Sequence, residues 1–201
     1  MKKVILAAAV VALTIGLAFP AIQIPMKVTI DGLPSTIEEF VKMRDEIALT
    51  PTGGAAMLVI ALLNYVKDES LGLKCMTAIL VNDGSMLKDD AKGFGGKSPN
   101  GSVVYLMTQL AKYPYVPNSY IDGTSVDDSY ALPSAPYTLY FSTNKYSVIN
   151  ETTVKVFIPT SGGNMPRPVT LIKNDKGIWK VKEFSSLVIG LSKVPQKSDD
   201  L

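Results

Sequence analysis

The segment GGAAMLVIALLNYV, residues 53–66, most constrains how this chain can fold, because it carries no charged side chain. A helix that is apolar on all sides must be buried, either in lipid or in the centre of a protein. The segment is shorter than the about 20 residues that a membrane-spanning helix needs. It therefore predicts a buried central helix, which begins after Thr50 with Pro51 in its first turn.

Gly53 and Gly54 stand in the first turn of this predicted helix. Each glycine weakens a helix by up to about 1 kcal/mol relative to alanine, so two in succession call for an explanation. Either another backbone packs closely against this turn, or the turn must expose bare amide groups. We favour close packing.

Three other segments have the spacing of amphipathic helices. In residues 36–48, apolar side chains recur at three- and four-residue steps, and Ser35 and Glu38 match the two partners of a capping box. The other two helices are predicted over residues 70–81 and from Ser98-Pro99 onward.

Beyond about residue 115 the helical period is lost. Residues 112–137 contain four prolines and five tyrosines, and predict an ordered connection that is held to the surface by its tyrosine rings. Alternation of apolar and polar residues then predicts strands, the last two joined as a hairpin by the turn residues 174–177. The predicted strands cover residues 137–142, 153–159, 168–174 and 178–184.

These patterns predict an α+β fold, with an N-terminal helical half of about four helices packed on a C-terminal antiparallel sheet of about four strands. Trp179 and Val181 fall on one face of the last strand and two lysines on the other, which indicates one solvated face. We expect a single domain over residues 26–195, followed by a polar tail at residues 196–201.

The first residues are typical of a secretory signal peptide. Lys2 and Lys3 precede an uncharged run at residues 4–19, which matches the positive start and apolar core of such a leader. We expect residues 1–21 to direct export to the periplasm or the medium. The alternative is an uncleaved segment that anchors the protein in the membrane.

Charge and residue types exclude several functions. Without Lys2 and Lys3, the 20 basic residues fall to 18, equal to the 18 acidic residues, and no basic cluster indicates a nucleic-acid partner. The chain has no histidine and one cysteine, Cys75. Serine and cysteine nucleophile systems that use histidine are therefore excluded, as are imidazole metal sites and an intrachain disulfide. We predict no cofactor and no metal, and a buried Cys75.

The stretch KGFGGKSPNG, residues 92–101, ends like a phosphate-binding loop at Gly96-Lys97-Ser98. Such a loop needs a first glycine five residues before Gly96, where the chain has Ala91. We therefore predict no nucleotide site, a polar loop over residues 82–98 and a helix cap at Ser98. The acid-rich stretches 82–90 and 122–129 lack the spacing of a calcium loop and are predicted to be turns.

Arg167 is the most interesting polar side chain, because Pro166 and Pro168 hold it on a stiff segment. Its planar fork suits a carboxylate or phosphate ligand, but we favour an internal salt bridge that fastens the start of this strand to the preceding loop. Tyr120, Asp122 and Trp179 complete the speculative ligand-binding set, and Trp179 is more typical of a core residue.

Three ordered stretches resemble one family: residues 50–65, residues 118–139 and residues 157–191. The chain is similar to an uncharacterised bacterial family of exported hypothetical proteins with a domain of unknown function, found in spirochaetes and other anaerobes. The resemblance implies a shared fold but no activity. It marks Arg167-Pro168, residues 177–180 and residues 185–187 as family-typical positions.

We expect a non-catalytic exported domain that binds or scaffolds an envelope protein or a small ligand. The alternative is an envelope hydrolase that uses carboxylates and Arg167 without histidine or metal. Two carboxylates about 5–9 Å apart in one concave pocket would favour the hydrolase.

The export hypothesis predicts that the protein recovered from the cell envelope or medium lacks Lys2 and Lys3. Signal peptidase removes the leader during translocation, so fractionation followed by mass spectrometry of the intact protein measures the outcome directly. A cytoplasmic protein that retains Met1 would contradict the hypothesis.

Overall fold

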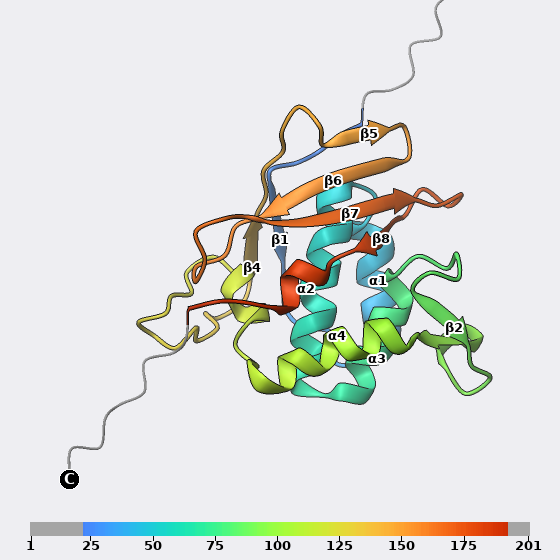
Figure 1. Cartoon of the computed structure of the whole chain (residues 1–201), viewed down its shortest axis with the longest axis horizontal. Helices are drawn as coiled ribbons and strands as arrows, with labels where there is room; N and C mark the ends of the chain where they lie inside the picture. The colour runs from blue at the N-terminus through green and yellow to red at the C-terminus, as the bar shows by residue number, and fades with distance from the viewer. Residues whose placement is uncertain (1–21, 193–201) are drawn as a thin grey trace, which may run out of the picture.

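The computed structural model describes residues 22–192 and has the predicted α+β fold (Figure 1). Within this range, four helices lie mostly in the N-terminal half and a four-stranded antiparallel sheet lies in the C-terminal half. The helices are α1 (Ile37–Ile47), α2 (Pro51–Lys67), α3 (Glu69–Ile79) and α4 (Gly101–Lys112). The strands are β1 (Lys27–Ile30), β2 (Leu87–Asp89), β3 (Lys97–Pro99), β4 (Tyr137–Tyr140), β5 (Val148–Asn150), β6 (Thr153–Ile158), β7 (Arg167–Lys173) and β8 (Trp179–Glu183). The 3-10 helices are η1 (Phe94–Gly96), η2 (Pro117–Tyr120) and η3 (Ser185–Val188).

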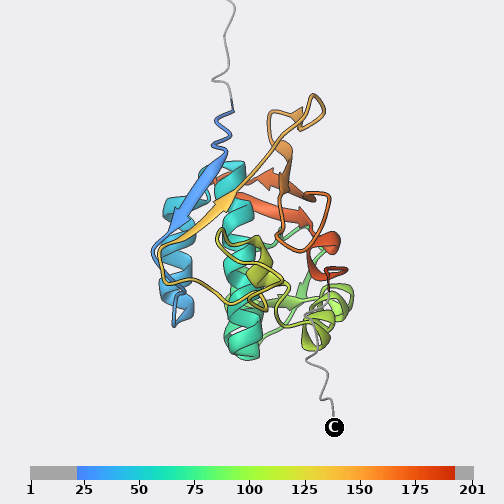
Figure 2. The same cartoon turned by 90° about the vertical axis from the view of Figure 1, so that its left-hand side faces the viewer.

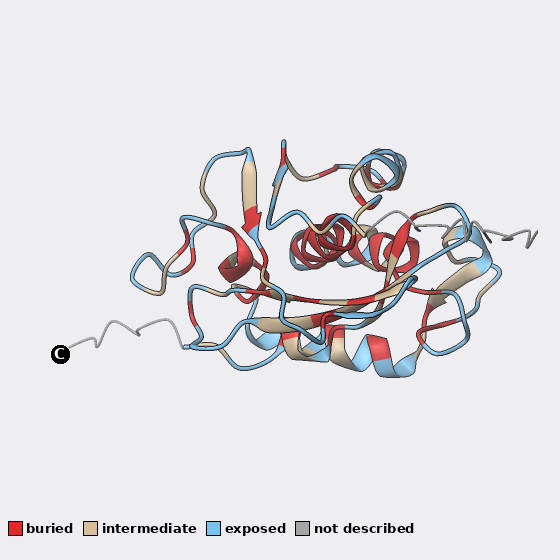
Figure 3. Cartoon of the chain, turned by 90° about the horizontal axis from the view of Figure 1, so that it is seen from above, coloured by how far each residue is buried: buried red, intermediate tan, exposed pale blue. Residues whose placement is uncertain are grey.

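Helix α2 is the centre of the molecule, as predicted. Every residue from Pro51 to Asn64 is buried, and α2 contacts the other three helices and strands β6, β7 and β8. Figure 3 shows α2 as a buried helix enclosed by its neighbours. No helix between residues 22 and 192 is long and apolar enough to cross a bilayer.

The paired glycines allow α2 to pack directly against backbone. A Cβ atom on Gly54 would lie 2.5 Å from the carbonyl oxygen of Trp179 and 2.7 Å from Cδ2 of Leu171. A Cβ atom on Gly53 would lie 1.8 Å from the carbonyl oxygen of Ile47. All three distances are far below van der Waals contact, so the packing interpretation of the glycine pair is confirmed.

The sheet has the strand order β5-β6-β7-β8, and each neighbouring pair is antiparallel. The predicted hairpin joins β7 to β8 through a turn in which Gly177 has a φ of +79°, a conformation that glycine adopts without steric cost. Alternate residues face α2, so the sheet supplies one wall of the core. Those buried residues are Val154, Val156, Ile158, Val169, Leu171, Trp179 and Val181.

Strand β4 does not join this sheet, although its alternating pattern was expected to place it there. It pairs with β1 in a separate two-stranded antiparallel sheet, which runs beside α2 in Figure 2. The fourth place in the larger sheet is taken by β5, which is exposed along its length. Alternation reveals that a strand is half buried but carries no information about its partner.

Both predicted helix caps are displaced along the chain. At α1, the Thr36 hydroxyl accepts the Glu39 amide at 3.2 Å, and the Glu39 carboxylate accepts the Ser35 amide at 2.7 Å. The capping pair is therefore one residue later than the predicted Ser35 and Glu38.

At α4, the cap is Asn100, whose side-chain oxygen accepts the Val103 amide at 3.1 Å. The predicted cap, Ser98, lies in β3 opposite Lys88 of β2. The predicted loop over residues 82–98 thus contains a short hairpin, which leaves the capping position to the residue that follows it.

The connection between α4 and β4 is ordered by its tyrosines, as predicted. The Tyr115 and Tyr130 rings stack with their centroids 5.0 Å apart, and Tyr113 meets Tyr115 edge-on at 6.2 Å. Stacked and edge-on rings stabilise a chain that lacks regular secondary structure.

We predict that Gly54→Ala destabilises the fold by about 1–3 kcal/mol, because the added methyl group must displace the backbone of β8. The matched control is Gly101→Ala, because nothing lies within 4 Å of a Cβ atom there. That control should be neutral or stabilising by up to about 1 kcal/mol. Thermal unfolding followed by circular dichroism measures both, and equal stability of the two variants would contradict the packing argument.

Candidate functional site

Arg167 lies at the start of β7 and holds the C-terminal end of the described chain. Its guanidinium donates a hydrogen bond to the backbone carbonyl of Gly190. Its Nε atom is buried and has no hydrogen-bond partner among residues 22–192. The salt-bridge interpretation placed the contact in the preceding loop, whereas the acceptor seen in the structure is a backbone oxygen of a later segment.

Two tyrosines hold the same segment. The Tyr120 hydroxyl donates to the carbonyl of Leu187 at 2.9 Å, and the Tyr130 hydroxyl donates to the carbonyl of Ser192 at 2.9 Å. Burial raises the pKa of the Tyr120 hydroxyl above its ordinary value, so this group remains a protonated donor near neutral pH. Arg167, Tyr120 and Tyr130 together fasten the chain between Leu187 and Ser192.

Trp179 is 2% exposed and packs in the core beside Gly54. Its backbone amide donates to the carbonyl of Ala48 at 2.8 Å, which ties β8 to the end of α1. The ring lines none of the three surface pockets described below, so the structure places Trp179 apart from the other predicted site residues.

Asp122 and Tyr120 do come together at a surface pocket of about 210 Å³. Asp122 is exposed, and its amide donates to the carbonyl of Thr138 at 2.9 Å. We call this concavity the hydroxyl pocket, because four of its lining residues are serines or threonines. Its lining residues are Ser119, Tyr120, Ile121, Asp122, Gly123, Thr124, Tyr140, Pro159, Thr160 and Ser161.

The hydroxyl groups of this pocket are positioned by one another. Thr160 donates to the Ser119 hydroxyl at 2.8 Å, and Ser119 donates in turn to the carbonyl of Val116 at 2.7 Å. The hydroxyls of Thr124 and Ser161 lie 3.0 Å apart. Because each of these hydroxyl groups donates its hydrogen within the protein, the set offers fixed acceptor oxygens to a polar ligand.

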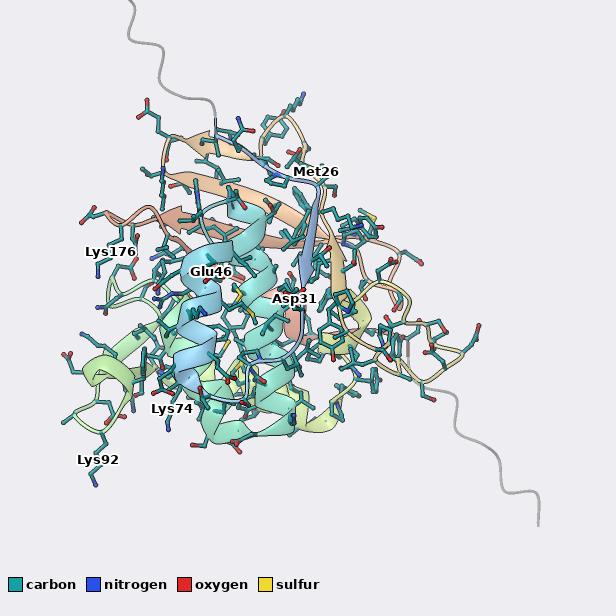
Figure 4. The ribbon with its side chains drawn as sticks, turned by 180° about the vertical axis from the view of Figure 1, so that it is seen from behind. Met26, Asp31, Glu46, Lys74, Lys92 and Lys176 are labelled. Carbon is teal, nitrogen blue, oxygen red and sulfur yellow. The ribbon has the colours of Figure 1, made fainter. Side chains whose placement is uncertain are left out.

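A second concavity, the acidic groove, lies between β1 and α1 and has a volume of about 400 Å³. Asp31, Glu39 and Glu46 line it together with Lys42, and Figure 4 shows Asp31 at the end of β1 and Glu46 on α1. Glu39 is committed to the helix cap, where hydrogen bonds from the Ser35 amide and hydroxyl lower the pKa of its carboxyl.

The carboxyl groups with clearly displaced pKa values are all shifted downward. A hydrogen bond from Lys182 lowers the pKa of Asp83, and the Lys92 amide lowers that of Asp90. Asp83 and Asp90 also accept amides of their own loop, from Ser85 at 3.0 Å and Lys92 at 3.0 Å. These amide contacts are those of ordinary turns, as predicted, although residues Leu87–Asp89 within the acid-rich stretch 82–90 form strand β2.

Among residues 22–192, no group of three or more histidine, cysteine or acidic residues is arranged to hold a metal ion. Cys75 is buried, as predicted, and burial raises the pKa of its thiol to about 12. A thiol with so high a pKa stays protonated and is a poor nucleophile. Cys75 is a core residue that contacts the Asn64 amide nitrogen at 3.8 Å.

Lys180 is the lysine at which burial most clearly disfavours the charged form of the amine. Its ammonium group and Nη1 of Arg44 both donate to the carbonyl of Ala78, in the last turn of α3. The carbonyl end of a helix is partly negative and attracts cations. Burial, reinforced by the charge of Arg44, nevertheless lowers the pKa of Lys180 to about 8.

A family model described as a domain of unknown function, DUF6935, matches residues 32–195. The chain belongs to this family. The matched region begins after β1 and includes every later element of the fold. The description of DUF6935 names no activity, and comparison with curated proteins and with solved structures gave no match.

The structure also brings together residues that the sequence did not single out. Thr160 and Ser161 meet Ser119 and Thr124 in the hydroxyl pocket, although about forty residues separate the two pairs. The strings IPTSGG and NSYIDGTS, which contain these residues, are rich in small polar side chains. That composition indicates turns and does not reveal which turns meet.

We predict that Lys180→Met raises the free energy of unfolding at pH 7 by about 1–2 kcal/mol, because it removes a charge that burial opposes. Between pH 8 and the ordinary lysine pKa near 10.4, the unfolded chain binds more protons at this position than the folded chain. Wild-type stability should therefore rise with pH in this window, and the advantage of the variant should shrink. Denaturant unfolding at pH 7, 8.5 and 10 measures the difference.

The matched control is Lys182→Met on the same strand. Lys182 donates to Asp83 and Ser85, so its removal should lower stability at pH 7 by up to about 1 kcal/mol. A Lys180→Met variant that is less stable than wild type at pH 7, with no dependence on pH, would contradict the burial argument.

Proposed function

We propose that this DUF6935 chain is a non-catalytic binding or scaffold domain of the cell envelope, and that the hydroxyl pocket holds its ligand. The leader-like sequence of residues 1–21 supports export, although it lies outside the described residues. The one observation that carries the binding proposal is the convergence of fixed hydroxyl groups, Asp122 and an exposed ring in a single concavity.

The chemistry of the pocket favours an uncharged ligand with several hydroxyl groups, such as one unit of a sugar chain. Asp122 can accept hydrogen bonds from ligand hydroxyls. The Thr124 hydroxyl donates to the carbonyl of Ile121 at 2.8 Å and the Ser161 hydroxyl points to Ser119 and Thr124, so their oxygens can accept further hydrogen bonds from the ligand. The Tyr140 ring is 46% exposed and offers an apolar face for stacking. The volume of about 210 Å³ is below the about 300–1,000 Å³ of pockets for drug-sized ligands, which suits a single ring.

The alternative, a carboxylate-dependent hydrolase, is favoured by one observation: three carboxylates line the acidic groove. Glycoside hydrolysis needs a general acid whose pKa is raised toward neutrality. Glu39 departs from that requirement, because its hydrogen bonds to Ser35 lower its pKa. Asp31 and Glu46 remain as the carboxylates that such an activity would use, and they serve to test it.

We predict that neutral disaccharides bind the protein weakly and that Tyr140→Ala lowers their affinity at least tenfold, since stacking on the ring is lost. Ligand-observed saturation-transfer NMR with a panel of neutral and acidic disaccharides measures the binding. The control is Tyr146→Ala, which removes a ring that is 72% exposed and does not line the pocket.

Equal loss of binding in both tyrosine variants would contradict the hydroxyl pocket as the ligand site. Hydrolysis of the same sugars by the wild-type protein, abolished by Asp31→Asn or Glu46→Gln, would instead establish the hydrolase.

A further inference from the structure

The β2–β3 hairpin and α3 enclose a third concavity, of about 330 Å³, which we call the lysine pocket. Four lysines from separate elements line it: Lys74 on α3, Lys88 on β2, Lys97 on β3, and Lys92 in the loop between the strands. Figure 4 shows Lys74 and Lys92 on the same side of the molecule. This concentration of charge is local, because the whole chain has a formal net charge of only +2.

The acids near the pocket neutralise only part of this charge. Lys97 pairs with Asp89 at 2.6 Å, and Asp90, whose carboxylate accepts the Lys92 amide, lines the pocket. The other ion pairs within residues 22–192 join Arg44 to Asp45 and Lys182 to Asp83. Lys74, Lys88 and Lys92 therefore have no ion-pair partner within that range, and the four lysines outnumber the two nearby acids.

The loop between β2 and β3 closes tightly beside the pocket. A Cβ atom on Gly93 would lie 2.0 Å from the carbonyl oxygen of Lys97, so the loop can close tightly only with glycine there. Phe94 and Val104 line the same pocket and supply apolar surface beside the lysines.

We propose that the lysine pocket binds a phosphate group carried on a partly apolar molecule. All four cations are ammonium groups, which act as point charges and do not form the planar two-bond contacts of arginine with a carboxylate. Such a cluster selects for charge density, and a phosphate monoester carries close to two negative charges at neutral pH. The apolar edge fits either a phospholipid headgroup with its glycerol or a soluble phosphate ester.

The lysine pocket is distinct from a nucleotide-binding loop. Lys97 and Ser98 line the pocket and also belong to the Gly96-Lys97-Ser98 string that resembles the end of such a loop. The motif fails at Ala91, and Lys97 and Ser98 lie in a β-hairpin where a nucleotide loop would lead from a strand into a helix. The proposal is also independent of the sugar ligand, because the lysine pocket and the hydroxyl pocket share no residue.

The test compares two double variants of the full chain that lose the same charge. Lys88→Gln with Lys92→Gln alters the pocket, whereas Lys112→Gln with Lys176→Gln alters exposed lysines outside it. One arm titrates glycerol 3-phosphate and inorganic phosphate by two-dimensional NMR. The other arm sediments the protein with vesicles of phosphatidylcholine, with and without phosphatidic acid.

We expect the pocket variant to lose at least tenfold in affinity in whichever arm shows binding, and the control to change less than twofold. Binding should weaken as salt rises, because ions screen the lysines, and Tyr140→Ala should leave it unchanged. Binding only to phosphatidic acid vesicles identifies a lipid headgroup, and binding to glycerol 3-phosphate identifies a soluble ester. No binding in either arm, or equal loss in both double variants, would overturn the proposal.

Discussion

The contact between the first turn of α2 and the backbone of β8 is the constraint on which the rest of the structure depends. Because Gly54 has no side chain, the helix approaches the carbonyl of Trp179 closely enough that one methyl group would collide with it. This approach sets the distance between the helical half and the sheet. The fourteen buried residues of α2 then fill the space between β6, β7, β8 and the other helices.

A second constraint lies at the opposite end of the chain. Arg167, Tyr120 and Tyr130 each donate a hydrogen bond to a backbone carbonyl between Leu187 and Ser192. Leu187 is buried, and a buried carbonyl without a partner would cost about 1–3 kcal/mol. The arginine that looked most like a ligand-binding group thus holds the segment around Gly190, and the hydroxyl pocket lies largely on other loops. Surface loops on a rigid scaffold are where binding sites are commonly found.

Much of the fold could be predicted from the periodicity of apolar residues in the sequence, whereas little of the candidate site could. The uncharged run from Gly53 to Val66 predicted a buried helix, and the turn residues around Gly177 predicted a hairpin of neighbouring strands. The caps at Thr36 and Asn100 were missed because adjacent polar residues compete equally well for a capping position. The partner of β4 was missed because alternation describes one strand at a time. The lysine pocket was missed because Lys74, Lys88, Lys92 and Lys97 form no cluster along the chain.

The sequence by itself determined the α+β class, the central helix, the buried Cys75 and the absence of histidine chemistry. Each of these depends on residue type or on spacing within one segment, and local physics acts on both. Only the tertiary structure decided that Arg167 fastens the segment around Gly190, that Ser119 meets Ser161, and that Lys74 of α3 shares a pocket with three lysines of the β2–β3 hairpin. These juxtapositions join separate elements of the fold, and the pattern of one segment does not reveal which other segment packs against it.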